Sequence, residues 1–99
     1  MVEVDINISK LELAAGKLRA ISHPMRIAII NLLDNGRKLS VTQIYEALDI
    51  EQATASHHLN ILKSKGLLIS QREGKKIYYS LKNIALTDIV ECINKCNED

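Results

Sequence analysis

The sequence predicts a single, mainly α-helical domain, residues 1–99, with one small β-hairpin, in the order α-α-α-α-β-β-α. Five segments are predicted to be helices, and in four of them apolar residues recur every three or four positions, which is the period of an amphipathic helix. Between the fourth and fifth segments, residues 67–81 contain two runs of strand-forming residues around a Gly-containing turn. With 99 residues and 46% hydrophobic content, the chain has material for one modest core.

The first two helices are separated by a break before Pro24. Residues 8–20 form the first helix, with an apolar stripe along one side. Pro24 suits the first turn of the second helix, because its missing N–H is not needed there. This helix is expected to end near Asn35 and Gly36, since both residues tolerate left-handed backbone.

Residues 40–65 have the pattern of a helix-turn-helix, with two short helices joined by a tight turn. Ser40 can cap the first helix of the pair, and Gln43 can complete a capping box. Gly66 is expected to stop the second helix. A last amphipathic helix covers about residues 84–97.

The second helix of the pair begins with small polar side chains, which suit DNA recognition. In a helix-turn-helix this helix enters the major groove with its N-terminal end first. Small donors and acceptors reach base edges and phosphates there, and an alanine allows close approach. The predicted DNA contacts on this helix are Gln52, Ala53, Thr54, Ser56 and His57. The next residue, His58, is expected to lie half-buried beside Leu62.

The hairpin that follows, residues 67–81, is predicted to be a cationic wing. Its tip carries Arg72, Lys75 and Lys76, which can reach phosphates or the minor groove of an adjacent turn. Five basic and two acidic residues give residues 51–80 a net charge of +3, although the whole chain carries only +1. Two basic and four acidic residues give residues 81–99 a net charge of −2. Either Tyr78 or Tyr79 must face outward, because neighbours in a strand alternate faces.

Several protein classes do not fit the sequence. It has no Gly-rich phosphate loop, no plausible pair of catalytic carboxylates and no nucleophile with a base at usable spacing, so an enzyme is not expected. No apolar run approaches the roughly 20 residues that span a bilayer, and the N-terminus has no signal-peptide shape. The two cysteines do not make a disulfide framework, which favours a reducing, cytoplasmic setting.

Three motifs resemble, in order, those of the ArsR/SmtB family of small bacterial winged-helix repressors. They are an opening at Leu18–Ile27, a recognition-helix pattern at Gln52–Leu62, and a wing pattern that begins at Gly66 and includes residues 72–79. The resemblance implies a homodimer built from the first and last helices that binds an inverted repeat in double-stranded DNA. It also implies a repressor that a small inducer releases, typically a metal ion.

A homodimer is also expected on physical grounds. Residues 8–20 and 84–97 carry apolar stripes, and so small a domain has few surfaces of its own to cover them. A two-fold dimer would present two recognition helices to half-sites about 34 Å apart, one turn of the duplex.

The sequence leaves the site of a possible inducer open between several alternatives. Family metal sites are absent or incomplete, because residues 39–43 contain no cysteine, and Asn83 and Ala85 occupy the first ligand positions of the last helix. The remaining candidates follow one side of that helix at spacings of four, four and three: Asp88, Cys92, Cys96 and Asp99. Their thiolates favour soft or borderline ions such as Zn(II), Cu(I) or As(III). Thiol oxidation, with a disulfide between subunits, and simple packing of both cysteines are the alternatives.

Two other functions stay open at this level. One is a constitutive DNA-binding regulator without an inducer. The other is a winged helix used for protein contacts, which would be expected to have a neutral wing and an apolar patch on the fourth helix. The polar residues 52–57 and the basic hairpin argue against the second.

Overall fold

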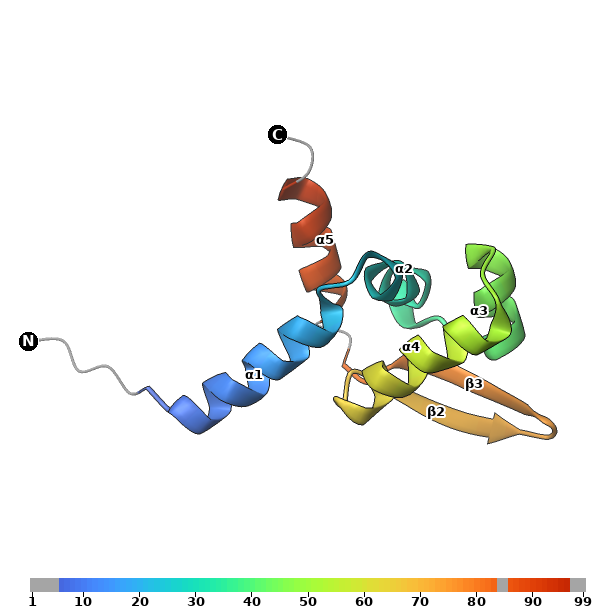
Figure 1. Cartoon of the computed structure of the whole chain (residues 1–99), viewed down its shortest axis with the longest axis horizontal. Helices are drawn as coiled ribbons and strands as arrows, with labels where there is room; N and C mark the ends of the chain where they lie inside the picture. The colour runs from blue at the N-terminus through green and yellow to red at the C-terminus, as the bar shows by residue number, and fades with distance from the viewer. Residues whose placement is uncertain (1–5, 84–85, 97–99) are drawn as a thin grey trace, which may run out of the picture.

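The computed structural model describes residues 6–83 and 86–96 and has the predicted order of elements, with two additions. Its helices are α1 (Ile8–Ile21), α2 (Pro24–Leu32), α3 (Val41–Leu48), α4 (Gln52–Ser64) and α5 (Leu86–Cys96). Its strands are β1 (Leu39–Ser40), β2 (Leu68–Glu73) and β3 (Lys76–Leu81). In Figure 1, α2, α3, α4 and the hairpin form a body from which α1 and α5 project in different directions. None of these described helices is long and apolar enough to cross a membrane.

The helix-turn-helix begins with the predicted capping box. Ser40 Oγ accepts a hydrogen bond from the backbone N–H of Gln43 at 3.2 Å, and Gln43 Oε1 accepts one from the backbone N–H of Ser40 at 2.9 Å. α3 ends at Asp49, whose backbone is left-handed with φ +53°. The turn into α4 is therefore tight, as the sequence predicts.

The second helix ends earlier than expected. α2 stops at Leu32 rather than near Asn35, because Asp34–Gly36 form a short 3-10 turn. Asn35 and Gly36 both have positive φ there, as predicted, but they follow that turn instead of ending the α-helix directly.

The hairpin belongs to a three-stranded antiparallel sheet in the order β1-β3-β2. β1 places Leu39 opposite Tyr79 and Ser40 opposite Tyr78. β1 was not predicted from the sequence, because two residues are too few to show a strand period. The consequence is that the segment entering α3 is hydrogen-bonded to the wing.

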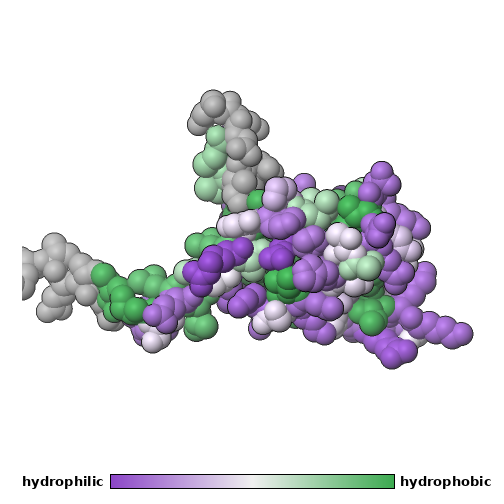
Figure 2. All heavy atoms as spheres, viewed as in Figure 1, coloured by the Kyte–Doolittle hydropathy of each residue, from purple (hydrophilic) through white to green (hydrophobic). Residues whose placement is uncertain are grey.

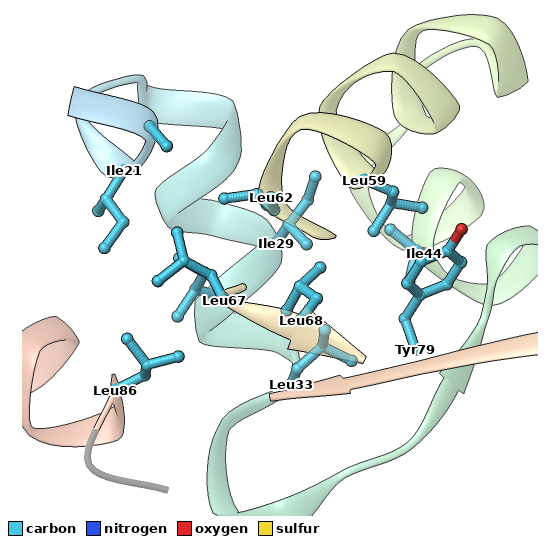
Figure 3. Packing of buried hydrophobic residues seen from close by; sticks show 12 residues of the cluster. Ile21, Ile29, Leu33, Ile44, Leu59, Leu62, Leu67, Leu68, Tyr79 and Leu86 are labelled. Atoms are coloured by element: carbon cyan, nitrogen blue, oxygen red, sulfur yellow. The ribbon is translucent and has the colours of Figure 1, made fainter. Parts of the chain in front are cut away.

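The core lies between the helices and the inner face of this sheet (Figure 3). The largest fully buried side chains are all aliphatic: Ile29, Ile30, Leu33, Ile44, Leu59, Leu62, Leu67 and Leu68. Tyr79 joins this cluster at 7% exposure, whereas Tyr78 is only half-buried. The predicted alternation of the two tyrosines is therefore confirmed.

The apolar stripe of α1 is largely uncovered in the single chain. Ile8, Leu11 and Leu18 are 61%, 54% and 55% exposed, and among the residues of α1 only Ala20 and Ile21 are buried. Figure 2 shows the hydrophobic side chains gathered along this projecting helix. Such a surface on a small chain is typical of an interface with another molecule.

Candidate nucleic-acid interface

The first half of α4 presents polar side chains to solvent because its apolar residues face the core. Ala55, Leu59 and Leu62 are fully buried at spacings of four and three, which fixes the inward side of the helix. The five predicted contacts lie away from that side: Gln52, Ala53, Thr54 and His57 are exposed, and Ser56 is half-buried.

The wing turns through two residues, Gly74 and Lys75, between the last cross-strand pair, Glu73 and Lys76. Gly74 has φ +64°, a conformation that suits the first residue of a two-residue hairpin turn and that glycine adopts without strain. Arg72 Nε donates a hydrogen bond to the Gly74 carbonyl oxygen at 3.2 Å. The three predicted basic residues are all exposed around this tip.

A groove connects the recognition helix to the wing. Its α4 side consists of Gln52, Ser56 and Asn60, which recur every four residues and share one side of the helix. The facing residues come from the hairpin and the start of α3: Lys75, Lys76, Ile77, Tyr79, Ser40, Val41 and Thr42. The groove thus has donors and acceptors for bases on one wall and ammonium groups on the other.

The structure brings four of the eight predicted contacts together in this groove: Gln52, Ser56, Lys75 and Lys76. The other three on α4 lie on its exposed surface outside the lining, and Arg72 lies opposite Ile77 on the neighbouring strand. Asn60 and Thr42 also line the groove and were not among the contacts predicted from the sequence. The four-residue spacing from Gln52 and Ser56 could have identified Asn60, whereas Thr42 depends on how α3 meets the wing.

The single acidic residue of the wing is neutralised within the chain. Lys38 Nζ lies 2.5 Å from Glu73 Oε1, and also 5.3 Å from the centre of the Tyr78 ring. Both side chains of the ion pair are over 40% exposed, so the pair adds little stability. Across the described residues it is the only ion pair, which leaves Arg72, Lys75 and Lys76 without acidic partners there. The wing tip therefore stays cationic.

His58 does not line the groove and is more deeply buried than expected, at 7% exposure. Its Nδ1 accepts a hydrogen bond from Arg26 Nε at 3.2 Å. Its ring centre lies 4.7 Å from that of His23 and 5.6 Å from that of His57. Burial first, and then the positive charges of His23, Arg26 and His57, lower the pKa of His58 below its usual value.

The candidate metal ligands do not assemble into a site within one chain. Asp88, Cys92 and Cys96 are exposed on α5, together with Glu91 and Lys95, and Asp99 lies outside the described residues. Within the described ranges no three His, Cys, Asp or Glu side chains are close enough to hold an ion. Both cysteines are free thiols. The predicted spacing puts them on one side of the helix but does not supply a ligand set.

Comparison with known proteins agrees with this geometry. Residues 23–70 match the family model described as bacterial regulatory protein, arsR family. The transcriptional repressor PagR of Bacillus anthracis is 38% identical over 93 residues, which cover 94% of this chain and 93% of PagR. The cadmium resistance transcriptional regulatory protein CadC of Listeria innocua is 34% identical over 96 residues, covering 90% of this chain and 81% of CadC.

Solved structures share the fold. The crystal structure of PagR superposes with a TM-score of 0.79 at 37% identity, over 88% of this chain and 99% of PagR. The solution structure of a homodimeric winged helix-turn-helix DNA-binding domain from Mycobacterium bovis gives a TM-score of 0.82 at 26% identity, over 99% and 90% of the two chains. The α4–wing groove thus lies in an established winged helix-turn-helix, and the chain belongs to the arsR family of bacterial regulatory proteins, which are DNA-binding transcriptional regulators and not enzymes.

Proposed function

We propose that this chain is a transcriptional repressor that binds an inverted repeat as a homodimer. The observation that carries the proposal is the groove that joins Gln52, Ser56 and Asn60 on α4 to Lys75 and Lys76 on the wing. In this arrangement α4 enters the major groove while the wing holds the adjacent backbone.

The dimer part of the proposal rests on the uncovered stripe of α1. A second copy can bury Ile8, Leu11 and Leu18, because its own α1 offers an apolar surface of the same kind for them to pack against. The homodimeric state of the Mycobacterium bovis domain supports this. Two copies then present two α4 helices to half-sites about one duplex turn apart.

The direct test is binding of the purified chain to a labelled duplex from its own promoter region, followed by fluorescence anisotropy. The affinity is expected to fall steeply as salt rises, because each phosphate contact releases counterions. A symmetric inverted repeat should bind more tightly than a single half-site of equal length. If the chain does not bind this duplex at low salt, the proposed function is wrong.

We further propose that a thiol-reactive inducer releases the chain from DNA. This inducer would be a soft metal ion, an arsenical or an oxidant. Its support is that Cys92 and Cys96 are exposed free thiols four residues apart on α5. An ion bound there needs further ligands, which the partner copy of a dimer can provide. The predicted inter-subunit disulfide would instead form by loss of two electrons from two thiols to an added oxidant.

The double variant Cys92→Ser, Cys96→Ser tests this part. It is expected to stay on DNA under the metals or oxidants that release the native chain. If it is released equally well, the thiols are packing residues. If nothing in a panel of metals, arsenite and peroxide releases the native chain, the protein is a constitutive regulator.

A further inference from the structure

A single guanidinium links the recognition helix to the end of α1. Arg26 on α2 donates from Nε to His58 Nδ1 on α4, and from Nη1 to the carbonyl oxygen of Ala20, both at 3.2 Å. Ala20 lies in the last turn of α1, and His58 directly follows the predicted DNA contact His57. One side chain therefore contacts both helices, in addition to the core that they share.

The bond between Arg26 and His58 requires a neutral imidazole. A guanidinium has only donors, so Nδ1 of His58 must offer a lone pair. Protonation would place an N–H on Nδ1, facing the N–H of Arg26, and would add a second positive charge at a buried position. The bond and the protonated imidazole therefore exclude each other.

No described group acts on His58 so as to stabilise its charged form. The titratable and charged groups that act on it are His23 ahead of α2, Arg26 on α2 and His57 on α4 itself, all of them basic. On α1, the Ala20 carbonyl oxygen accepts a hydrogen bond from Arg26 and not from His58. A proton on His58 therefore breaks the bond to Arg26 and adds a charge to a basic cluster, which weakens the link between α4 and α1.

We propose that Arg26 and His58 are a positioning pair for DNA binding, which holds α4 against the end of α1 only while His58 is uncharged. Neither residue lines the groove, so both act through the orientation of the helix that carries Gln52 and Ser56. DNA affinity then falls in mildly acidic solution. This inference rests on the proposed DNA-binding function.

The expected pH profile follows from mass action. If only the neutral form positions α4, affinity is constant well above the pKa of His58. Below that pKa it falls by up to about tenfold per pH unit for each copy, or about a hundredfold for a dimer that binds with both copies. Because the neighbouring His57 is itself a predicted DNA contact, the role of His58 must be isolated by variants.

The test is anisotropy with the promoter duplex between about pH 5.5 and 8 at constant ionic strength. His58→Asn keeps an acceptor near the position of Nδ1 but does not titrate, so native affinity at the high end and a smaller decline in acid are expected. Arg26→Gln removes the charge, and its shorter side chain cannot reach both His58 Nδ1 and the Ala20 carbonyl oxygen. It is expected to weaken binding most at the high end and to flatten the decline in acid, because the bond that a proton on His58 breaks is already absent.

Arg19→Gln is the matched control, since Arg19 is exposed in the last turn of α1 and loses the same charge. It should leave the midpoint where it is. An unchanged midpoint and slope in His58→Asn, or an equal loss at every pH in Arg26→Gln, would overturn the positioning pair while DNA binding stands. If neither the native chain nor any variant binds DNA at the highest pH, both the positioning pair and the proposed DNA-binding function are wrong.

A second measurement needs only the native chain. By reciprocity, DNA that prefers the neutral form must lower the pKa of His58 further when it binds. The ring Cε1–H resonances of the three histidines, followed by NMR with and without the duplex, give this pKa directly. An unchanged pKa of His58 on binding would overturn the coupling even if His58→Asn does not fold.

Discussion

Gln52 and Lys75 line the same groove, and as predicted DNA contacts they differ in kind. The amide of Gln52 has a donor and an acceptor side by side, which can distinguish one base edge from another. The ammonium of Lys75 is a point charge that any phosphate satisfies. Affinity and discrimination are therefore assigned to different residues of the same site.

Substitutions at these positions should separate the two properties. Gln52→Ala or His57→Ala is expected to lower the discrimination between cognate and random DNA by about 1–3 kcal/mol for a lost base contact. Lys75→Ala should weaken binding to both DNAs by a similar factor. Competition titrations with the two duplexes measure the ratio, and equal losses on both DNAs from all three variants would contradict these roles.

At the scale of elements, α3 is held at its start by the sheet as well as by its cap. Ser40 is 4% exposed, its backbone belongs to β1, and its hydroxyl accepts from the N–H of Gln43. Loss of that hydroxyl leaves a helix-terminal N–H in a poorly hydrated place without its acceptor. The cap therefore stabilises both the helix-turn-helix and its junction with the wing.

Ser40→Ala is expected to lower the free energy of unfolding by about 1 kcal/mol, the usual cost of a lost N-cap. Urea unfolding at a fixed chain concentration measures it, because the stability of a dimer depends on concentration. Thr42→Ala, exposed in the same helical turn, is the control and should change stability by less than about 0.5 kcal/mol. A Ser40→Ala chain as stable as the native one would show that the capping box contributes nothing.

At the scale of the whole molecule, the surface predicted to contact DNA and the surface proposed to contact a second copy are distinct. Hydrophilic residues cover the hairpin end, while exposed apolar side chains gather along α1 (Figure 2). α1 contributes only its last residues to the core. Its interface can therefore be changed while the packing shown in Figure 3 is kept.

The variant Leu11→Glu, Leu18→Glu is expected to be monomeric, because it would place four carboxylates in one two-fold apolar contact. Sedimentation velocity measures the change in mass, and circular dichroism checks that the helices persist. DNA affinity should fall at least tenfold, since two half-sites no longer bind as one. The control is Ile69→Glu, which alters an exposed apolar residue on β2, and a double variant that stays dimeric would place the interface elsewhere.

The sequence predicted the features that depend on neighbours along the chain. The capping box of Ser40 and Gln43 and the inward stripe of α4 are local patterns, and the structure has both. β1 and the bond between Arg26 and His58 were not predicted, because their partners lie about 40 and 32 residues away and only the packed fold brings them together. For the same reason Thr42 became a candidate contact only once the packed fold placed the start of α3 beside the wing.

The pairing of β1 with β3 has a consequence for engineering. A hairpin that stood alone could be exchanged between related regulators as a cassette, in order to change which DNA the wing contacts. Here, transplanting residues 67–81 from a relative would pair that relative's β3 with Leu39 and Ser40 of this chain. A poor fit between these strands would disturb the start of α3. The smallest unit that can be transferred intact between relatives is therefore residues 39–81, the strand, both helices and the hairpin together.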